Sequence, residues 1–282
     1  MTVHDWLYNA ITQLQSAKIA TARLDALVLL ADCSGHDKGY LLAHTELSLT
    51  AVQIAELQKL LNRRATHVPL SYLRGKTEFY GREFIVGPGV LVPRPESEAI
   101  VDVLKDLSGH LQEQPGYPID GQQWQVADVG AGSGALGITA FLEQPELAVT
   151  LLEIDDDALQ LAKTNVMNLS TSIPVIKSNL LAGTTTSFDI LLCNLPYVPD
   201  AYPINLAASH EPAIALFGGN DGLDIYRQLF QQIKIVAKKP LYILTEALPE
   251  SHLKLTSLAE ADGYTLVKTN DFVQLFKLAA GS

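Results

Sequence analysis

The stretch "VADVGAGSGALGITA" at residues 126–140 decides how this chain folds. It begins with apolar residues typical of a buried strand, passes through a glycine loop and ends in a segment typical of a helix. Gly130, Gly132 and Gly134 have no Cβ atom, so a ligand can approach the turn closely. The helix that follows offers unpaired backbone N–H groups at its start. A strand, a glycine turn and a helix in this order predict a ligand site at the carboxyl edge of an open α/β sheet.

The residues on both sides continue this alternation of apolar runs and helical periodicity. Strands are predicted at 124–129, 148–153, 173–177, 188–193, 240–246, 264–268 and 272–278, with helices at 134–143, 156–168, 222–237 and 250–261. Strands separated by helices imply right-handed crossovers and a largely parallel sheet. The last two strands are too close for a crossover helix, so we expect them to pair antiparallel. The sequence therefore predicts an α/β, Rossmann-like domain with a seven-stranded, mostly parallel sheet.

The chain before this domain has a different pattern. Residues 1–66 show apolar side chains at helical spacing, and Thr50-x-x-Gln53 is a capping-box signal for the start of a helix. No strand-like alternation occurs in this part of the sequence. We therefore expect a small helical domain over residues 1–75.

A β-hairpin is predicted between the two domains. In "KTEFYGREFIVGPGVLVPRPESE" (76–98), apolar and polar residues alternate on both sides of Gly87-Pro88-Gly89, where we expect the turn. The polar segment 108–123 reads as a loop without an assignable role. The predicted boundaries are residues 1–75 for the helical domain, 76–93 for the hairpin linker and 94–282 for the α/β domain.

Composition and cysteine usage are those of a globular protein with a sizeable core. Of the 282 residues, 48% are hydrophobic and 18% are charged. No apolar run approaches the roughly 20 residues needed to span a bilayer, and the start of the chain lacks the features of a signal peptide. Cys33 and Cys193 are too few for a disulfide framework. We therefore expect a cytoplasmic protein that does not contact a membrane.

Charge is unevenly divided along the chain, whose net charge is −11. Residues 1–75 hold 7 Lys and Arg against 6 Asp and Glu, whereas residues 76–282 hold 13 against 25. Because nucleic-acid affinity arises largely from neutralising phosphates, the acidic larger part argues against direct nucleic-acid binding. Two local basic segments, "LNRRATH" (61–67) and "SYLRGK" (71–76), are interpreted as a solvated helix end.

The glycine loop is followed by further residues suited to a nucleoside cofactor. Glu153 ends the next predicted strand, nineteen residues after Gly134, where a carboxylate can accept both hydroxyls of a ribose. In "SNLLAG" (178–183), Asn179 and Leu180 are candidates to line an adenine pocket. The loop also satisfies the G-x-G-x-x-G dinucleotide fingerprint. NAD and S-adenosylmethionine therefore remain equal alternatives on these residues alone.

A second motif, "NLPY" at residues 194–197, follows the predicted strand "FDILLC". It suits a flat group that carries an –NH2, either an amide or an aromatic amine. The side-chain oxygen of Asn194 can accept one hydrogen of that group, and a backbone carbonyl at 194–195 can accept the other. Pro196 fixes the direction of the backbone, and Tyr197 offers a ring on which the flat group can stack.

Two acceptors on such a nitrogen favour its methylation. The lone pair is delocalised, so the nitrogen is a poor nucleophile, and acceptors on its hydrogens stabilise the positive charge that develops during transfer. A sulfonium methyl group held about 3–3.5 Å away in line completes the reactive geometry. Hydride transfer has no comparable use for these four residues. The two motifs together favour S-adenosylmethionine over NAD.

Longer blocks around these motifs resemble one known family over about residues 69–230. The blocks are "PLSYLRGKTEFYGREFIVGPGVLVPRPESE", "DVGAGSGALGI" and "EPAIALFGGNDGLDIYRQL" (211–229). In them the chain is similar to the bacterial peptide chain release factor N5-glutamine methyltransferases of the HemK/PrmC type. The resemblance implies a class I methyltransferase fold and methylation of the glutamine side-chain amide in the Gly-Gly-Gln motif of class I release factors. It implies S-adenosyl-L-methionine as donor and a helical domain that helps to hold the release factor.

The motifs and the resemblance give one set of candidate residues. The catalytic box is Asn194, Leu195, Pro196 and Tyr197. The cofactor-binding candidates are Asp128, Gly130, Ala131, Gly132, Ser133, Gly134, Glu153, Asn179, Leu180 and Asn194. No metal site is predicted, because the seven His residues show no metal-ligand spacing. Glu246, which ends the fifth predicted strand, is a candidate supporting acid.

Three positions depart from the usual pattern of the family. Leu195 stands where Pro is usual, Asn179 where Asp is common, and Leu180 where an aromatic residue is frequent. Without Pro at position 195 a backbone restraint worth about 0.4–1 kcal/mol of unfolded-state entropy is lost. Asn-Leu-Pro-Tyr also resembles the box of the ribosomal RNA adenine-N6 dimethyltransferases, which are one alternative. A glutamine methyltransferase of a ribosomal protein and a non-catalytic binding module are the others.

Overall fold

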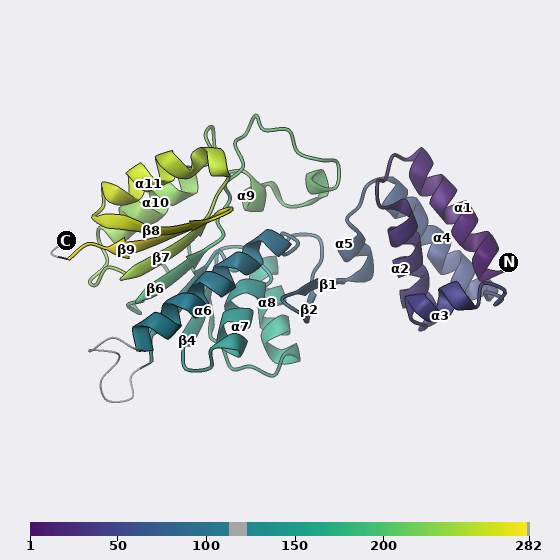
Figure 1. Cartoon of the computed structure of the whole chain (residues 1–282), viewed down its shortest axis with the longest axis horizontal. Coiled ribbons are helices and arrows are strands. Elements are labelled where there is room, and N and C mark those ends of the chain that lie inside the picture. Colours follow the sequence, from purple (N-terminus) through teal and green to yellow (C-terminus); the bar gives the residue numbers. More distant parts are fainter. Residues whose placement is uncertain (113–122, 281–282) are drawn as a thin grey trace. The chain divides into compact units, whose positions relative to one another are not determined.

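The computed structural model describes residues 1–112 and 123–280, whose helices and strands are drawn in Figure 1. The chain divides into two compact units. The helical unit comprises Met1–Lys76 and the short segment Ile204–His210, and the sheet unit comprises Thr77–Pro203 and Glu211–Ser282. The segment Ile204–His210 thus belongs to the N-terminal unit, although most of the sheet precedes it in sequence.

The helical unit is built from helices whose starts are capped by side chains. Thr2 and Asp5 form a capping box at the first helix, and Thr50 and Gln53 form the one expected from the sequence. The apolar faces of the longer helices meet in a core of buried Leu, Ala and Trp side chains. The helices are α1 (Val3–Ser16), α2 (Ala22–Ser34), α3 (Lys38–Ala43), α4 (Ala51–Ala65) and α5 (Leu70–Arg74).

Arg64 corrects the interpretation of the basic segments. Its side chain is buried, and its Nε donates to Oδ2 of Asp25 on α2 at 2.7 Å. Arg74 pairs with Asp32 at 2.6 Å in a more exposed position. The basic segments are therefore not simply a solvated helix end, because part of their charge is neutralised inside the unit. Removal of one partner from the buried pair would leave an uncompensated charge.

The sheet unit contains a seven-stranded sheet in the order β5-β4-β3-β6-β7-β9-β8. Strands β3 to β7 run parallel, and β9 pairs antiparallel with both β7 and β8. This topology confirms the predicted mostly parallel sheet and its antiparallel final pair. The strand order reverses at β3, where open sheets place their ligands. The strands are β3 (Gln125–Val129), β4 (Ala148–Glu153), β5 (Val175–Lys177), β6 (Ile190–Cys193), β7 (Tyr242–Glu246), β8 (Tyr264–Asn270) and β9 (Val273–Leu278).

Helices cover both faces of this sheet (Figure 1). Along β6, Ile190 and Leu192 pack into the core on one face, whereas Leu191 and Cys193 pack into the core on the other. All four side chains are fully buried, which explains the continuous apolar run. The first layer holds α6 (Glu98–Gln112), α7 (Ala135–Glu143) and α8 (Asp156–Asn168), and the second holds α10 (Asp224–Ile233) and α11 (His252–Glu260), with the short α9 (Ala213–Leu216) in the loop after β6.

The hairpin lies earlier in the chain than predicted. Strands β1 (Lys76–Phe79) and β2 (Arg82–Ile85) are joined by Tyr80 and Gly81, both at positive φ of 52° and 70°. Two central residues at positive φ are typical of a type I′ turn. The expectation of a turn at Gly87-Pro88-Gly89 is therefore wrong. It failed because a Tyr at positive φ is uncommon, while Gly-Pro-Gly is a strong turn signal.

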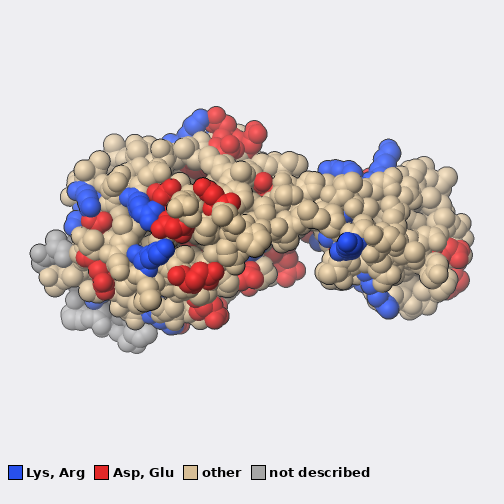
Figure 2. Space-filling view, turned by 90° about the horizontal axis from the view of Figure 1, so that it is seen from above, with Lys and Arg blue, Asp and Glu red and all other residues tan. Residues whose placement is uncertain are grey.

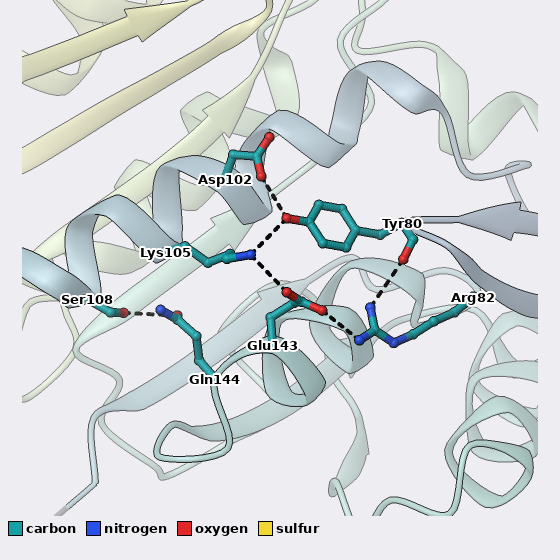
Figure 3. A network of polar contacts seen from close by, with 7 residues as sticks. All are labelled: Tyr80, Arg82, Asp102, Lys105, Ser108, Glu143 and Gln144. Atoms are coloured by element: carbon teal, nitrogen blue, oxygen red, sulfur yellow. Dashed lines mark hydrogen bonds and ion pairs between the residues drawn. The ribbon is translucent and has the colours of Figure 1, made fainter.

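Polar side chains fix this hairpin to α6 and α7 (Figure 3). The Tyr80 hydroxyl donates to Asp102 at 2.7 Å and accepts from Lys105 at 3.2 Å. Glu143 accepts from Lys105 at 2.9 Å and from Arg82 at 2.6 Å. Most of the hairpin therefore belongs to the sheet unit, whose helices hold it on both sides of its turn.

The segment 108–123 is only partly described. Helix α6 continues to Gln112, so the first residues of this segment are helical and not a loop as expected. Residues 113–122 lie outside the described part of the chain. Among the described residues, no helix has the length and apolar character that a membrane span requires.

The acidic character of the larger part of the chain is visible at the surface. Asp and Glu side chains form clusters on the sheet unit in the view of Figure 2, and Lys and Arg side chains lie between them. Several of these charges are paired, for example Lys268 with Asp106 at 2.9 Å. Exposed pairs of this kind add little stability. The excess of acidic groups over basic ones makes the surface potential of this unit negative.

Candidate active site

Two adjoining cavities open at the carboxyl edge of β3, β4 and β6. The larger has a volume of about 260 Å³ and the smaller about 60 Å³. Gly130, Gly132 and Asn194 line both, so the cavities meet at the glycine loop. All of their lining residues belong to the sheet unit. This is the position expected for a ligand of an open α/β sheet.

Most of the candidate cofactor residues surround these cavities. Gly134 lines neither cavity and lies beneath the loop, where a Cβ would stand 3.0 Å from side-chain atoms of Ile138 and Leu151. The larger cavity is lined by Gly130, Gly132, Glu153, Asn179, Leu180 and Asn194 among others, and the smaller one also by Asp128, Ala131 and Ser133.

Sequence reasoning missed the apolar walls of the larger cavity. They come from scattered places in the chain, and each residue alone looks like ordinary loop or core. The missed apolar lining residues are Val90, Leu91, Ile154, Ala158, Ile214, Ala215 and Ile225. Ile154 lies directly after Glu153, and Val90, Leu91, Ile214, Ala215 and Ile225 lie in the blocks that carry the family resemblance, but neither signal predicts contact with a ligand.

The glycine loop is pinned to the neighbouring strand by its own backbone. Gly130 N and Ala131 N both donate to Leu152 O, at 2.8 and 3.0 Å. Gly130, Gly132 and Gly134 have φ values of 72°, 55° and 79°. Residues with a side chain rarely adopt such φ values, so glycine is required for the path of the loop as well as for ligand access.

Asp128 holds the start of α7 from the end of β3. It is buried, and its Oδ2 accepts a hydrogen bond from Gly137 N at 2.8 Å. Burial raises the pKa of Asp128 to about 7; the hydrogen bond from Gly137 opposes this rise, and the charge of Glu153 adds to it. A Cβ at Gly137 would come within 2.8 Å of the Cβ of Asp128. Gly137 is thus needed for this close contact.

Glu153 is held by three backbone donors. Its Oε2 accepts from Gly132 N at 2.7 Å, and its Oε1 accepts from Ile154 N at 2.7 Å and Asp155 N at 2.9 Å. The side chain is largely buried yet lines the larger cavity. A carboxylate offers about four acceptor positions, so it can still accept ligand hydroxyls.

Leu180 occupies an uncommon backbone conformation at the cavity wall. Its φ is 55°, a value that few residues other than Gly, Asn and Asp adopt. Ser178 stabilises this turn, since its Oγ donates to Leu180 O at 2.6 Å and accepts from Gly183 N at 2.8 Å. Strained residues held in this way gather at ligand sites.

Asn194 lies at the junction of the two cavities with a fixed amide. Its Nδ2 donates to the Ser97 hydroxyl at 2.7 Å. Within the described part of the chain, its Oδ1 makes no hydrogen bond, so this acceptor is available to a ligand. Leu195 and Pro196 line the larger cavity beside it.

Tyr197 is held from the next strand. Its hydroxyl donates to Glu246 Oε1 at 2.9 Å, and its side chain lines neither cavity. Burial is the main cause that raises the pKa of Tyr197, and the charge of Glu246 adds to it. Glu246 is fully buried, and burial raises its pKa above the usual range. Glu246 thus lies next to the box, and its role as a supporting acid stays a prediction.

A glycine-rich segment after the box forms its outer wall. A Cβ at Gly218 would overlap the carbonyl oxygen of Pro196, and one at Gly222 would overlap that of Tyr197. Val198 N donates to Leu216 O at 3.0 Å, which aligns the two segments. The block 211–229 was singled out in the sequence, but its contact with the box was not predicted.

Tyr226 and Glu211 brace the site from two further positions. The Tyr226 hydroxyl lies 2.9 Å from Cys193 O and 2.7 Å from Glu246 O, so it joins the ends of β6 and β7. Glu211 is buried and accepts from Arg94 at 2.7 Å.

Within the described residues, no group of three or more His, Cys, Asp or Glu side chains could hold a metal ion.

Comparison with known proteins now gives the family. The model of the PrmC N-terminal domain matches residues 5–75, and that of the methyltransferase small domain matches residues 107–209. The release factor glutamine methyltransferase of Koribacter versatilis (strain Ellin345) is 33% identical over 238 residues, which cover 83% of this chain and 81% of that protein. The chain belongs to the release factor glutamine methyltransferase family. The Bacillus subtilis (strain 168) member is 32% identical over 228 residues, covering 78% of this chain and 76% of that protein.

Some relatives of this methyltransferase are longer. The bifunctional methyltransferase of Rickettsia felis (strain ATCC VR-1525 / URRWXCal2) is 30% identical over 283 residues, which cover 92% of this chain and 54% of that protein. The chain thus spans about half the length of that relative.

Solved structures share the fold of this methyltransferase. The catalytic domain of hMettl16 in complex with MAT2A 3′UTR hairpin 1 has a TM-score of 0.54 at 16% identity, covering 90% of each chain. The T. thermophilus 16S rRNA N2 G1207 methyltransferase (RsmC), in complex with AdoMet and guanosine, has a TM-score of 0.52 at 18% identity and covers 72% of this chain and 49% of that one. At these identities the likeness shows the class I methyltransferase fold alone.

The family makes this chain an S-adenosylmethionine-dependent methyltransferase. The larger cavity suits that cofactor in three respects. Its glycine cradle is open where side chains would intrude, its carboxylate is oriented by backbone donors, and much of its wall is apolar. The two ribose hydroxyls of this cofactor can bond the carboxylate, and its adenine ring can pack against the apolar wall.

Proposed function

We propose that this enzyme methylates the side-chain amide nitrogen, N5, of the glutamine in the Gly-Gly-Gln motif of class I peptide chain release factors. The observation that carries this proposal is the fixed amide of Asn194. Because Ser97 holds Nδ2, the oxygen Oδ1 is left to accept a hydrogen from a substrate amide. The names of relatives at 33% and 32% identity support the same substrate class.

In this proposal the two cavities together hold the donor, and the glutamine reaches Asn194 where they meet. Glu153 accepts the ribose hydroxyls, and the glycine loop faces the amino acid part of the donor. When bound, S-adenosylmethionine supplies an electrophilic sulfonium methyl group. The proposed donor site consists of Asp128, Gly130, Ala131, Gly132, Ser133, Gly134, Glu153, Asn179, Leu180 and Asn194.

The residues of the box act on the glutamine amide. Asn194 Oδ1 and a backbone carbonyl at 194–195 accept its two hydrogens, which stabilises the positive charge that develops on nitrogen. Pro196 restrains the backbone, so that the carbonyl is oriented before the substrate arrives. Tyr197 lines neither cavity, so its support of the box is indirect, with its hydroxyl held by Glu246. The nitrogen loses a proton after the methyl group has arrived, so no strong base is needed.

We further propose that residues 1–75 recognise the release factor, that residues 76–93, which begin with the hairpin, connect the two domains, and that residues 94–282 carry the chemistry. The match of the PrmC N-terminal domain to residues 5–75 supports a role specific to this family. Under this division, a short Gly-Gly-Gln peptide reaches the chemistry but lacks the contacts of the whole release factor. We expect kcat/KM to be much lower for the peptide than for the whole release factor.

The test is a methyl-transfer assay with several acceptors in parallel. The full chain is mixed with donor carrying a labelled methyl group and, separately, with purified class I release factor, ribosomal proteins and ribosomal RNA. The modified residue is then mapped by peptide mass spectrometry. We expect label on the Gly-Gly-Gln glutamine alone. Label on ribosomal protein or RNA, with none on the release factor, would overturn the proposal.

A further inference from the structure

Ser97, which lines the smaller cavity, and Glu246, which lines neither, contact the two polar side chains of the box. Asn194 Nδ2 donates to Ser97 Oγ at 2.7 Å, and the Tyr197 hydroxyl donates to Glu246 Oε1 at 2.9 Å. The Ser97 hydroxyl also lies close enough to the carboxyl of Glu246 to lower the pKa of that group. Asn194, Ser97, Glu246 and Tyr197 thus form one chain of polar contacts.

An asparagine amide has two ends of nearly equal size and opposite hydrogen-bonding character. If Asn194 turned over, Nδ2 would face the substrate, and a donor cannot accept hydrogen from the glutamine –NH2. The partner of Nδ2 therefore decides whether the site works. Ser97 can be that partner only while its oxygen accepts, which requires its own proton to be donated elsewhere.

Glu246 is the group to which Ser97 can donate its proton, since the hydroxyl lies close to this carboxyl. An ionised carboxylate only accepts hydrogen bonds, so hydroxyls facing it must point their protons toward it. Its Oε2 is buried and has no well-aligned hydrogen bond within the described residues, so the carboxyl retains acceptor capacity. Hydrogen bonds along this series of polar contacts are then all donated toward Glu246, from Asn194 to Ser97 and on to Glu246, and from Tyr197 to Glu246.

We propose that Ser97 and Glu246 are positioning residues that fix the amide of Asn194 and the ring of Tyr197 for the substrate glutamine. This inference rests on the function proposed above, because it assigns Asn194 Oδ1 to that amide. The arrangement costs stability, since a buried carboxylate is expensive even with partners. A buried acid retained next to the box is expected when it orients reacting groups.

Some features of the surroundings of Glu246 raise its pKa and others lower it. Burial raises the pKa of Glu246, whereas the hydrogen bonds from Ser97 and Tyr197 lower it. Glu96 raises this pKa further and Arg94 lowers it. The hydroxyl donors therefore support the ionised form that the directed contacts require.

The first test compares turnover with binding in the full-length chain. For Ser97→Ala and Glu246→Gln, we expect kcat with release factor to fall by about 10-fold or more, because the amide loses its fixed orientation. The Kd of S-adenosylmethionine and the KM of the release factor should stay unchanged. Ser97→Thr keeps the hydroxyl and should restore turnover. Full kcat in Ser97→Ala, or no recovery in Ser97→Thr with a normal melting temperature, would overturn the proposal.

Ser108 provides a matched control in the same unit. Like Ser97 it is 3% exposed, and its hydroxyl bonds the amide of Gln144 at 3.0 Å, away from the cavities (Figure 3). Ser108→Ala removes a buried serine–amide contact, in which the serine hydroxyl donates to Gln144 Oε1, without touching the box. We expect its kcat to equal that of the unmodified chain. An equal loss in Ser108→Ala and Ser97→Ala would mean a general effect on stability and would refute the proposed role.

A second measurement needs no release factor. Side-chain amide protons of Asn194 can be followed by NMR, with their signals assigned by their disappearance in Asn194→Ala. We expect slow solvent exchange in the unmodified chain and fast exchange in Ser97→Ala and Glu246→Gln. Unchanged exchange in both variants would overturn the positioning role. Protected amide protons in a chain that does not modify release factors would instead count against the proposed substrate alone.

Discussion

Two buried glutamates end strands of the same sheet edge, and the protein holds them in different ways. Glu153, at the end of β4, receives three hydrogen bonds from backbone N–H groups. Glu246, at the end of β7, is instead faced by the side-chain hydroxyls of Tyr197 and Ser97. The first carboxylate borders the larger cavity, whereas the second borders neither.

This difference separates a carboxylate that meets a ligand from one that orients side chains. Once the loop has folded, its backbone N–H groups fix the carboxylate of Glu153. The remaining acceptor positions of this carboxylate are then oriented for ribose hydroxyls. Hydroxyl donors make Glu246 part of a chain that ends at Asn194 and Tyr197. The donor side, β3 and β4, should therefore control binding, and the acceptor side, β6 and β7, should control turnover.

The largest effect is expected from Asn194→Ala on the acceptor side. Loss of the acceptor for the substrate amide should lower kcat by about 10³-fold, the upper end for a single transition-state hydrogen bond. Donor affinity, measured by calorimetry, should persist. Near-full turnover in this variant would remove the amide-acceptor mechanism and with it the division of labour between the two sides.

A second test removes the charge of the buried acid on β3. The pKa of Asp128 is raised from 3.8 to about 7, so the folded state retains a proton that the unfolded state loses at lower pH. Stability should therefore fall as pH rises from about 4 to 7. Asp128→Asn keeps an acceptor for Gly137 N and should raise the free energy of unfolding at pH 8 by about 2–4 kcal/mol. Denaturant titrations at pH 4 and pH 8 check this, and an equal gain at both would contradict it.

Glu153→Ala tests the donor side directly. Donor affinity should weaken by about 1–3 kcal/mol, the scale for losing hydrogen bonds to a charged group. Calorimetry measures this change, and a melting curve controls for loss of the backbone contacts of Glu153. Unchanged affinity in a folded variant would take Glu153 out of the donor site and leave the comparison with Glu246 without basis.

The smallest effect concerns the wall of the larger cavity. Leu180→Phe should strengthen donor binding by about 0.5–1.5 kcal/mol through contact of two flat rings. The positive φ of Leu180 is no harder for Phe to adopt, so little backbone cost is added. A competition assay with S-adenosylhomocysteine can resolve this gain. Weaker binding would show that the ring does not lie over position 180.

The centre of the sheet was predictable because β3, β4, β6 and β7 are mostly apolar, buried runs. Strand β4 and helix α8 fall at the predicted positions, 148–153 and 156–168. The hairpin turn was not, because Tyr80 adopts a positive φ that tertiary contacts on its hydroxyl and backbone stabilise. Local sequence rules favoured the Gly-Pro-Gly segment and could not see those contacts.

The candidate site was predictable where one loop carries several residues. The glycine loop, Glu153 and Asn194 could be named from spacing alone. Ser97 could not, because it lies 97 residues before Asn194 in the sequence and bonds it only in the folded unit. The glycines at 218 and 222 were visible, yet their contacts with the carbonyls of the box depend on how two loops meet.

The helical unit is built from two segments that lie far apart in the sequence, and this affects the order in which the chain folds during synthesis. The unit includes Ile204–His210, where His210 Nε2 lies 2.9 Å from Thr66 O. N-terminal domains generally fold first as a chain leaves the ribosome. Here the N-terminal unit cannot be completed until residue 210 has emerged, after β3 to β6 are already available to pair. Truncation of the chain at residue 76 would therefore remove the contacts of Ile204–His210 with this unit and leave its buried core, which lies within residues 3–73.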